Sequence, residues 1–248
     1  MARILAEELA AGRRDVQSLA LRWVARHLSE PRDIDPETGA ALAHLARHGA
    51  PPSRAAGFGS DPLVRAVPVA LATFDAPGAL VSATYHIAAL THPDPLVAWS
   101  AVAVNVALAR FLQGKRDFVP DVIEALRNNG VPEALLAAVR RIPLPAHAVT
   151  ARESSVPGHA LDDADAALRL AYHEPLWERG LHDMAGAAAA AGRAGLAGAL
   201  LGARDGVGAI PAAWNSRVDA DVLSLLAARL VRAEHAAVSP SSPLATLP

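Results

Sequence analysis

The sequence has 248 residues and contains no cysteine, few aromatic residues and no excess of basic residues. Without cysteine the chain has no disulfide framework and no thiolate chemistry, which fits a reducing compartment, so we expect a cytoplasmic protein. Lys and Arg number 23 and Asp and Glu number 25. Because no basic surplus is present to neutralise a phosphate backbone, we expect no nucleic-acid partner.

Segments for targeting or for membrane insertion are also not expected. The first ten residues contain acidic side chains and no apolar h-region, unlike a signal peptide. The stretch 184–203 is apolar, but it is dominated by Gly and Ala and is interrupted by Arg193. A membrane span needs a stronger run of large apolar residues, so this stretch predicts a buried helix and no membrane partner.

The composition favours helices. Hydrophobic residues make up 52% of the chain and aromatic residues only 4%, so the core must be built mainly from Ala, Leu and Val. Alanine has the highest helix propensity and loses no side-chain entropy on folding. Valine falls at helical spacings rather than in alternating strand patterns. The predicted fold class is therefore all-α, in a single compact multi-helix domain.

Apolar periodicity and capping residues divide the chain into helices. Asp15 precedes an apolar stripe with helical spacing, and Asp35-Pro36 opens the next helix. Two long loops are expected, at 49–61 and 142–158. With no repeat and no clean linker, we expect one domain over 1–235 and a disordered tail over 236–248. The expected helices cover 2–11, 16–30, 36–48, 62–73, 77–90, 95–113, 119–128, 132–141, 161–172, 175–185, a Gly- and Ala-rich segment up to 203, and 218–233.

Two short motifs have both a structural and a functional interpretation. The segment 91–95, THPDP, is typical of a helix cap, but it also places His92 near a helix N-terminus, where free N–H groups attract anions. The loop Gly57-Phe58-Gly59-Ser60-Asp61 offers flexible backbone, a hydroxyl and a carboxylate. It follows no predicted strand and contains no lysine, so it is neither a dinucleotide fingerprint nor a phosphate-binding loop.

The densest group of acids is Asp162, Asp163 and Asp165. We interpret these acids as an N-cap with favourable helix-dipole interactions, because a divalent ion needs about six oxygen ligands and the local sequence supplies too few. Glycines at spacings of three and four within 195–202 predict close packing of this helix against its neighbours. His182 and Asp183 are adjacent on a helix, point in different directions and form no dyad.

Several segments, taken in order, resemble the ADP-ribosylglycohydrolase family over most of the chain. The C-terminal segment, in register with THPDP, is the most specific. The segments are RDVQSLALRWVARHL with DIDPETGAALAHL, Gly59 to Arg65 with Pro68, LTHPDP, Pro157 to Leu161 followed by AALRLA, and GLAGALLGARDGVGAIPAAW.

The resemblance implies a reaction and its cofactor. Members of the family hydrolyse the glycosidic bond of ADP-ribose attached to a protein side chain or a related group, using two magnesium ions held by acidic residues. One acidic motif, Thr-Asp-Asp, falls before Met1 in this register. The other, Asp-x-Asp-Thr, falls on Ala189-Ala190-Ala191-Gly192, and alanine methyls cannot bind magnesium. We therefore expect no metal ligands, no magnesium cofactor and no metal-dependent hydrolysis.

The resemblance also implies which positions line the ligand site: Gly59, Ser60, Asp61, His92, Gly158 and His159. Asp61 stands in place of a family glycine and brings negative charge towards the expected position of a diphosphate. The first hypothesis is a degenerate member that binds ADP-ribose, a nucleotide-like molecule or a protein partner, including a second copy of itself.

The alternative hypothesis is a metal-independent enzyme acting on an ADP-ribose-, NAD- or nucleoside-derived substrate. Its acid and base candidates are Asp61, His92 and His159, provided that one cavity brings them within hydrogen-bond reach. A chain whose N-terminal segment is supplied separately is a third interpretation, and it would still lack the C-terminal aspartates.

Overall fold

The computed structural model describes residues 1–30, 34–54, 57–127, 129–145, 159–185, 191–215 and 218–232. Within these ranges the chain forms helices, and the only β-type pairing is an isolated antiparallel bridge between Gly59 and His159. The all-α prediction is confirmed. The helices are α1 Ala2–Ala10, α2 Val16–Ser29, α3 Pro36–His48, α4 Asp61–Thr73, α5 Pro77–Ala89, α6 Pro95–Leu112, α7 Val119–Arg127, α8 Glu133–Arg140, α9 Ala160–His173, α10 Trp177–Ala185, α11 Ala191–Asp205, α12 Ala212–Asn215 and α13 Ala220–Arg232.

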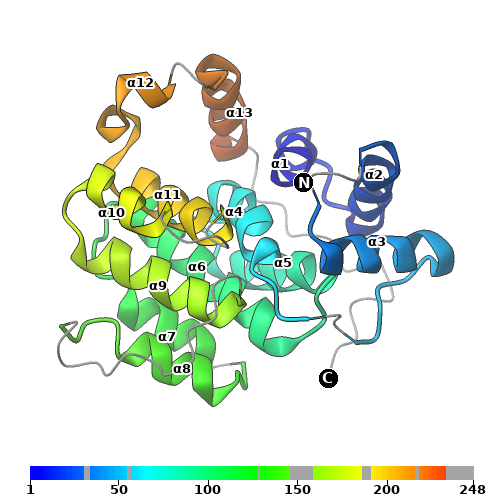
Figure 1. The fold of residues 1–248 in the computed structure, drawn as a ribbon, viewed down its shortest axis with the longest axis horizontal. Coiled ribbons are helices and arrows are strands. Elements are labelled where there is room, and N and C mark those ends of the chain that lie inside the picture. Colours follow the sequence, from blue (N-terminus) through cyan, green and yellow to red (C-terminus); the bar gives the residue numbers. More distant parts are fainter. Residues whose placement is uncertain are drawn as a thin grey trace.

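Helix α6 lies at the centre of the domain. It packs against α4, α5, α7, α9 and α11, while α1 to α3 lie on one side of the molecule and α13 rests against α1 and α4 (Figure 1). Nearly every residue between Val97 and Ala109 is buried. Alanine and valine on all faces of α6 let the neighbouring helices approach closely, because small side chains keep the backbones near one another.

Helix α6 is also the one described helix that is long and apolar enough to cross a membrane, and most of it is buried inside this fold. Its single amide side chain, Asn105, is fully buried, and its Nδ2 donates to Ala66 O and Thr84 Oγ1, each at 2.9 Å. A buried polar group with partners fixes the register of the helices around it. Burial on every face is what a core helix requires.

The predicted helix starts follow from aspartate caps. The Asp15 carboxylate accepts hydrogen bonds from Gln17 N and Ser18 N, and the Asp94 carboxylate accepts one from Leu96 N. Asp35 likewise caps α3 by accepting from Thr38 N at 2.9 Å. These bonds satisfy N–H groups that have no intrahelical acceptor, so each cap sets where its helix begins.

The structure corrects one local interpretation. The residue that precedes α9 is His159, and Asp162 and Asp163 lie inside the first turn and are buried instead of capping the helix in solvent. Asp165 forms an ion pair with Arg169 one turn later. Two short elements, the 3₁₀ turn Val207–Ala209 and α12, were not predicted. The predicted tail 236–248 and most of the loop 142–158 lie outside the described residues.

Candidate functional site

A partly buried polar cluster lies where α3, the N-terminus of α4 and the turn before α6 meet. Glu37, in the first turn of α3, accepts a hydrogen bond from Gly59 N at 2.9 Å, and the same oxygen lies 3.2 Å from His92 Nε2. Asp35, Glu37 and His92 each offer one ligand atom, and these three atoms lie within 4.8 Å of one another. The helix cap of α3 and the turn before α6 thus bring two carboxylates to one imidazole.

Arg65 of α4 connects the three elements that form the cluster. Its guanidinium is 1% exposed, and it donates to Asp61 Oδ2 at 2.7 Å, to Thr38 Oγ1 at 3.1 Å and to Thr91 Oγ1. The guanidinium also lies over the ring of Trp23, 5.2 Å from its centroid. Burial lowers the pKa of Arg65 and the Asp61 carboxylate opposes that shift. Because arginine stays protonated in proteins, a fixed positive charge remains here.

His92 is completely buried, and both of its ring nitrogens have neighbours. Nδ1 lies 3.0 Å from Thr91 Oγ1, and Nε2 faces Glu37. Burial lowers the pKa of His92, and the charge of Arg65 lowers it further, while the hydrogen bond and charge of Glu37 act in the opposite direction. The net direction is downwards, so the imidazole is neutral at pH 7 and keeps a lone pair.

The loop 57–60 lies between this cluster and α9. A Cβ on Gly57 would overlap the Glu37 carboxylate, and one on Gly59 would lie 2.7 Å from Glu37 Oε2, so both positions need glycine for close approach. Ala160 N donates to Phe58 O at 2.7 Å, and the rings of Phe58 and His159 lie 5.4 Å apart. The loop is therefore fixed to α3 on one side and to α9 on the other.

A second polar contact joins α9 to the first turn of α11. Arg193 Nε donates to Asp163 Oδ1 at 2.8 Å, with the carboxylate fully buried. A Cβ on Gly192 would overlap Ser60 Oγ and would lie 3.7 Å from Asp163 Oδ2. The first described turn of α11 thus meets α9 through the Arg193 guanidinium and meets the loop 57–60 through Gly192, which lies against the Ser60 hydroxyl.

The predicted site residues divide between these two contacts. His92 and Asp61 belong to the first cluster, and Ser60 lies against α11. His159 Nδ1 lies 3.8 Å from Asp162 Oδ2. Among the described residues no hydrogen bond joins any two of Asp61, His92 and His159. Gly158 lies outside the described residues.

Several residues of the site were not predicted. They include Thr38, Arg65, Thr91, Asp163 and Arg193, together with Asp35 and Glu37 as possible ligands. Glu37 and His92 are 55 positions apart, and Asp163 and Arg193 are 30 apart. No local pattern joins residues at such distances. The helix-dipole rule explains an acid at the start of α3 equally well, so the only signal for Glu37 pointed to capping.

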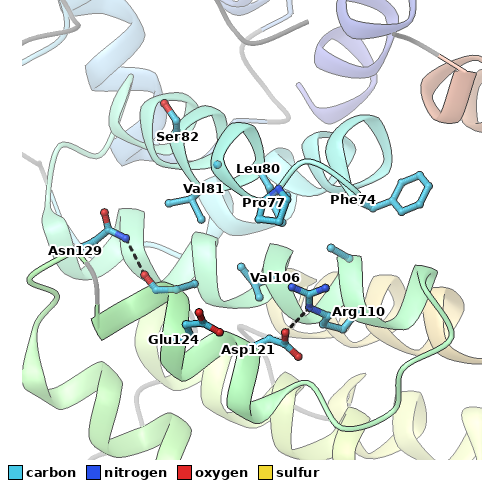
Figure 2. Close-up of a pocket in the computed structure, with 13 residues that line it drawn as sticks. Phe74, Pro77, Leu80, Val81, Ser82, Val106, Arg110, Asp121, Glu124 and Asn129 are labelled. Atoms are coloured by element: carbon cyan, nitrogen blue, oxygen red, sulfur yellow. Dashed lines mark hydrogen bonds and ion pairs between the residues drawn. The ribbon is translucent and has the colours of Figure 1, made fainter. Parts of the chain in front are cut away.

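A cleft of about 450 Å³ lies elsewhere, between α5, the end of α6 and α7 (Figure 2). It has apolar walls that include Leu80, Val81 and Val106, and Arg110 pairs with Asp121 at 3.0 Å along one edge. None of the predicted site residues lines it. Sequence motifs and the shape of the surface therefore indicate different places on the molecule.

Comparisons with known proteins agree with the sequence resemblance. The family model described as ADP-ribosylglycohydrolase matches residues 1–239. The chain belongs to the ADP-ribosylglycohydrolase family. A solved structure titled "ADP-ribosylglycohydrolase-related protein complex" is similar to this member of the family, with a TM-score of 0.75 and 26% sequence identity over 93% of this chain and 78% of that one. No curated protein matches this ADP-ribosylglycohydrolase-family chain.

Proposed function

We propose that this chain is an ADP-ribosylglycohydrolase-family protein that does not hydrolyse ADP-ribosyl bonds with magnesium and that uses the family scaffold to bind a ligand. The observation that carries the proposal is the contact of the first turn of α11 with α9 and the loop 57–60. There Arg193 pairs with the buried Asp163, and Gly192 lies directly against Ser60.

The chemistry of that contact does not suit magnesium. By resemblance, position 192 is where the family has the threonine of its Asp-x-Asp-Thr motif, and Gly192 offers no oxygen. Magnesium requires oxygen ligands in near-octahedral geometry. Arg193 places a positive charge 2.8 Å from the buried Asp163 carboxylate, and that charge would repel a magnesium ion bound to the same carboxylate in a poorly solvated site. The residues described here therefore do not fit the family's metal ions, and no catalytic step is assigned to them.

The loop 57–60 supports a binding role. Phe58 is 46% exposed although it is a large apolar side chain, and its ring lies beside that of His159. Exposed aromatic rings of this kind provide a stacking surface for a nucleobase. On its inner side the loop donates a hydrogen bond from Gly59 N to the Glu37 carboxylate. The loop backbone therefore already binds an anion. We propose ADP-ribose or a nucleotide-like molecule as the ligand. In this proposal the negative charge of Glu37 repels the phosphates of the ligand and weakens its binding.

The alternative of a metal-independent enzyme has less support. Asp61 is engaged with Arg65, and His92 is fully buried with neighbours at both nitrogens. A general acid or base needs hydrogen-bond reach to its substrate. Those two side chains would first have to leave their present partners.

The test has two parts. The first is hydrolysis of ADP-ribosyl-arginine and ADP-ribosyl-serine proteins in saturating magnesium, with an active family hydrolase as positive control; we expect no release of ADP-ribose. Magnesium-dependent release above the protein-free rate would contradict the proposal. The second is calorimetric titration with ADP-ribose, for which we expect binding that magnesium leaves unchanged.

The variant Glu37→Gln sharpens the titration. It removes a negative charge near the loop while its amide oxygen can still accept from Gly59 N. We expect about fivefold tighter binding, the equivalent of about 1 kcal/mol of like-charge repulsion at a partly exposed site. Glu133→Gln, on an exposed face of α8, is the matched control and should leave the affinity unchanged. Absence of any ADP-ribose binding in both the wild type and Glu37→Gln would overturn the binding role.

A further inference from the structure

We infer that Asp35, Glu37 and His92 form a binding site for a divalent transition-metal ion of the Zn²⁺ or Mn²⁺ type. The site is built from α3 and the turn before α6. It includes none of the positions that the family's acidic motifs occupy. It uses one imidazole nitrogen and two carboxylate oxygens.

The spacing of the donor atoms suits such an ion. His92 Nε2 and Glu37 Oε2 lie 3.2 Å apart, and two ligands at about 2.0–2.2 Å from a tetrahedral ion are separated by roughly 3.3–3.5 Å. Asp35 completes the group within 4.8 Å. One Asp35 oxygen caps α3, whereas its Oδ2 is buried and accepts no hydrogen bond. A buried carboxylate oxygen without a donor is costly, and a metal ion would satisfy it.

The local charge balance points the same way. Arg65 donates to Asp61 and to two threonine hydroxyls, so within the described residues its hydrogen bonds do not reach Asp35 or Glu37. The group that faces Glu37 is His92, whose Nε2 lies 3.2 Å from Glu37 Oε2. The charge of Arg65 acts on Asp35 through space without a hydrogen bond between them, and a divalent cation between the two carboxylates would add to that compensation.

The neighbours of His92 are those of a metal-binding histidine. Thr91 Oγ1 accepts from Arg65 and lies 3.0 Å from His92 Nδ1, so in the Nδ1–H tautomer the ring donates a hydrogen bond to the hydroxyl, which sets the ring orientation. In that tautomer Nε2 has a lone pair and cannot donate to Glu37, so a cation between Nε2 and the carboxylate would replace the hydrogen bond that the other tautomer makes. Outer contacts of this kind fix the tautomer of metal-bound histidines. The nitrogen donor favours transition ions over magnesium.

The experiment is titration of the full chain, stripped with chelator, with Zn²⁺, Mn²⁺ and Mg²⁺ by calorimetry, and with Co²⁺ by visible absorption. We expect one Zn²⁺ or Co²⁺ per chain and much weaker binding of Mg²⁺. Asp35→Asn and Glu37→Gln keep the cap and the loop hydrogen bond but remove a charged ligand, and each should weaken the affinity at least about tenfold. Thermal unfolding of the metal-free variants checks that they fold.

Two controls separate this site from surface binding. Asp15→Asn alters an equivalent cap on α2 that is not part of the Asp35, Glu37 and His92 group, and should bind metal like the wild type. His48→Ala removes the His44–His48 ring pair on α3, whose centroids lie 4.4 Å apart and which can bind transition ions by itself. Binding that is lost in His48→Ala but kept in Glu37→Gln and Asp35→Asn would overturn the inference, as would absence of stoichiometric Zn²⁺ or Co²⁺ binding.

Discussion

The two polar contacts that flank the loop 57–60 differ in where the arginine lies. On the α11 side, Arg193 pairs directly with the buried Asp163. On the α3 side, the buried Arg65 is engaged by Asp61 and two threonines, so Glu37 faces an imidazole instead. By our two proposals, the same scaffold excludes a cation on one side of the loop and favours one on the other. The position of one guanidinium decides between them.

The largest expected effect is on stability, at Arg65. In Arg65→Met the hydroxyls of Thr38 and Thr91 lose a charged donor in the interior and Asp61 loses its ion pair. Removing one partner of a buried ion pair costs about 3–5 kcal/mol, and we expect the lower end because Asp61 is partly exposed. Urea unfolding measures the change. Arg3→Met, whose ion pair with Glu7 is exposed, should change stability by less than about 0.5 kcal/mol. Equal losses in the two variants would show that Arg65 does not hold the cluster together.

The next effect concerns the packing of α11. In Gly192→Ala the new Cβ meets Ser60 Oγ, whereas in Gly202→Ala, on the same helix, it meets nothing within 4 Å. Both changes gain the same helix propensity, so their difference isolates the contact. We expect Gly192→Ala to be less stable than Gly202→Ala by about 1–2 kcal/mol in denaturant unfolding. The double variant with Ser60→Gly should reduce that difference. If the two alanine variants are equally stable, position 192 has room for a side chain.

The smallest effect is the pH dependence that His92 adds. Because the pKa of His92 is lowered in the folded protein, the unfolded chain binds the proton first as the pH falls below about 6.5. The free energy of unfolding should therefore fall with decreasing pH in that window, by at most about 1.4 kcal/mol per pH unit. His92→Gln should remove this part of the slope in unfolding curves between pH 7.5 and 5.5. The exposed His48→Gln should keep the slope of the wild type, and a steeper slope in His92→Gln would contradict the account.

Much of the fold could be predicted because its signals are local. Asp15, Asp35 and Asp94 each stand immediately before an apolar helical stripe, and each caps the helix that follows. Helix α12 has four residues, which is too short to show a helical period. The prediction that Asp162 and Asp163 cap α9 in solvent was wrong, because an exposed cap and a buried acid in the first turn have the same local sequence.

The site was harder to predict because its contacts are distant in sequence. The resemblance identified Ser60, Asp61 and His92, but Ser60 lies against α11 and His92 faces Glu37 of α3, and both contacts join segments far apart in the sequence. The sequence around Asp35 predicts that it caps a helix, but it does not reveal that Asp35 Oδ2 accepts no hydrogen bond. Glu37 faces His92 only because α3 packs beside the turn before α6. Such pairings depend on tertiary packing, which periodicity and capping rules do not contain.

One measurement tests both sides of the loop together. A crystal of the full chain soaked in Mn²⁺ would show bound ions directly by their anomalous scattering. The account predicts a peak between His92 Nε2 and the carboxylates of Asp35 and Glu37, and none beside Gly192 and Asp163. A peak coordinated by Asp163 at the start of α11, with none at His92, would contradict it.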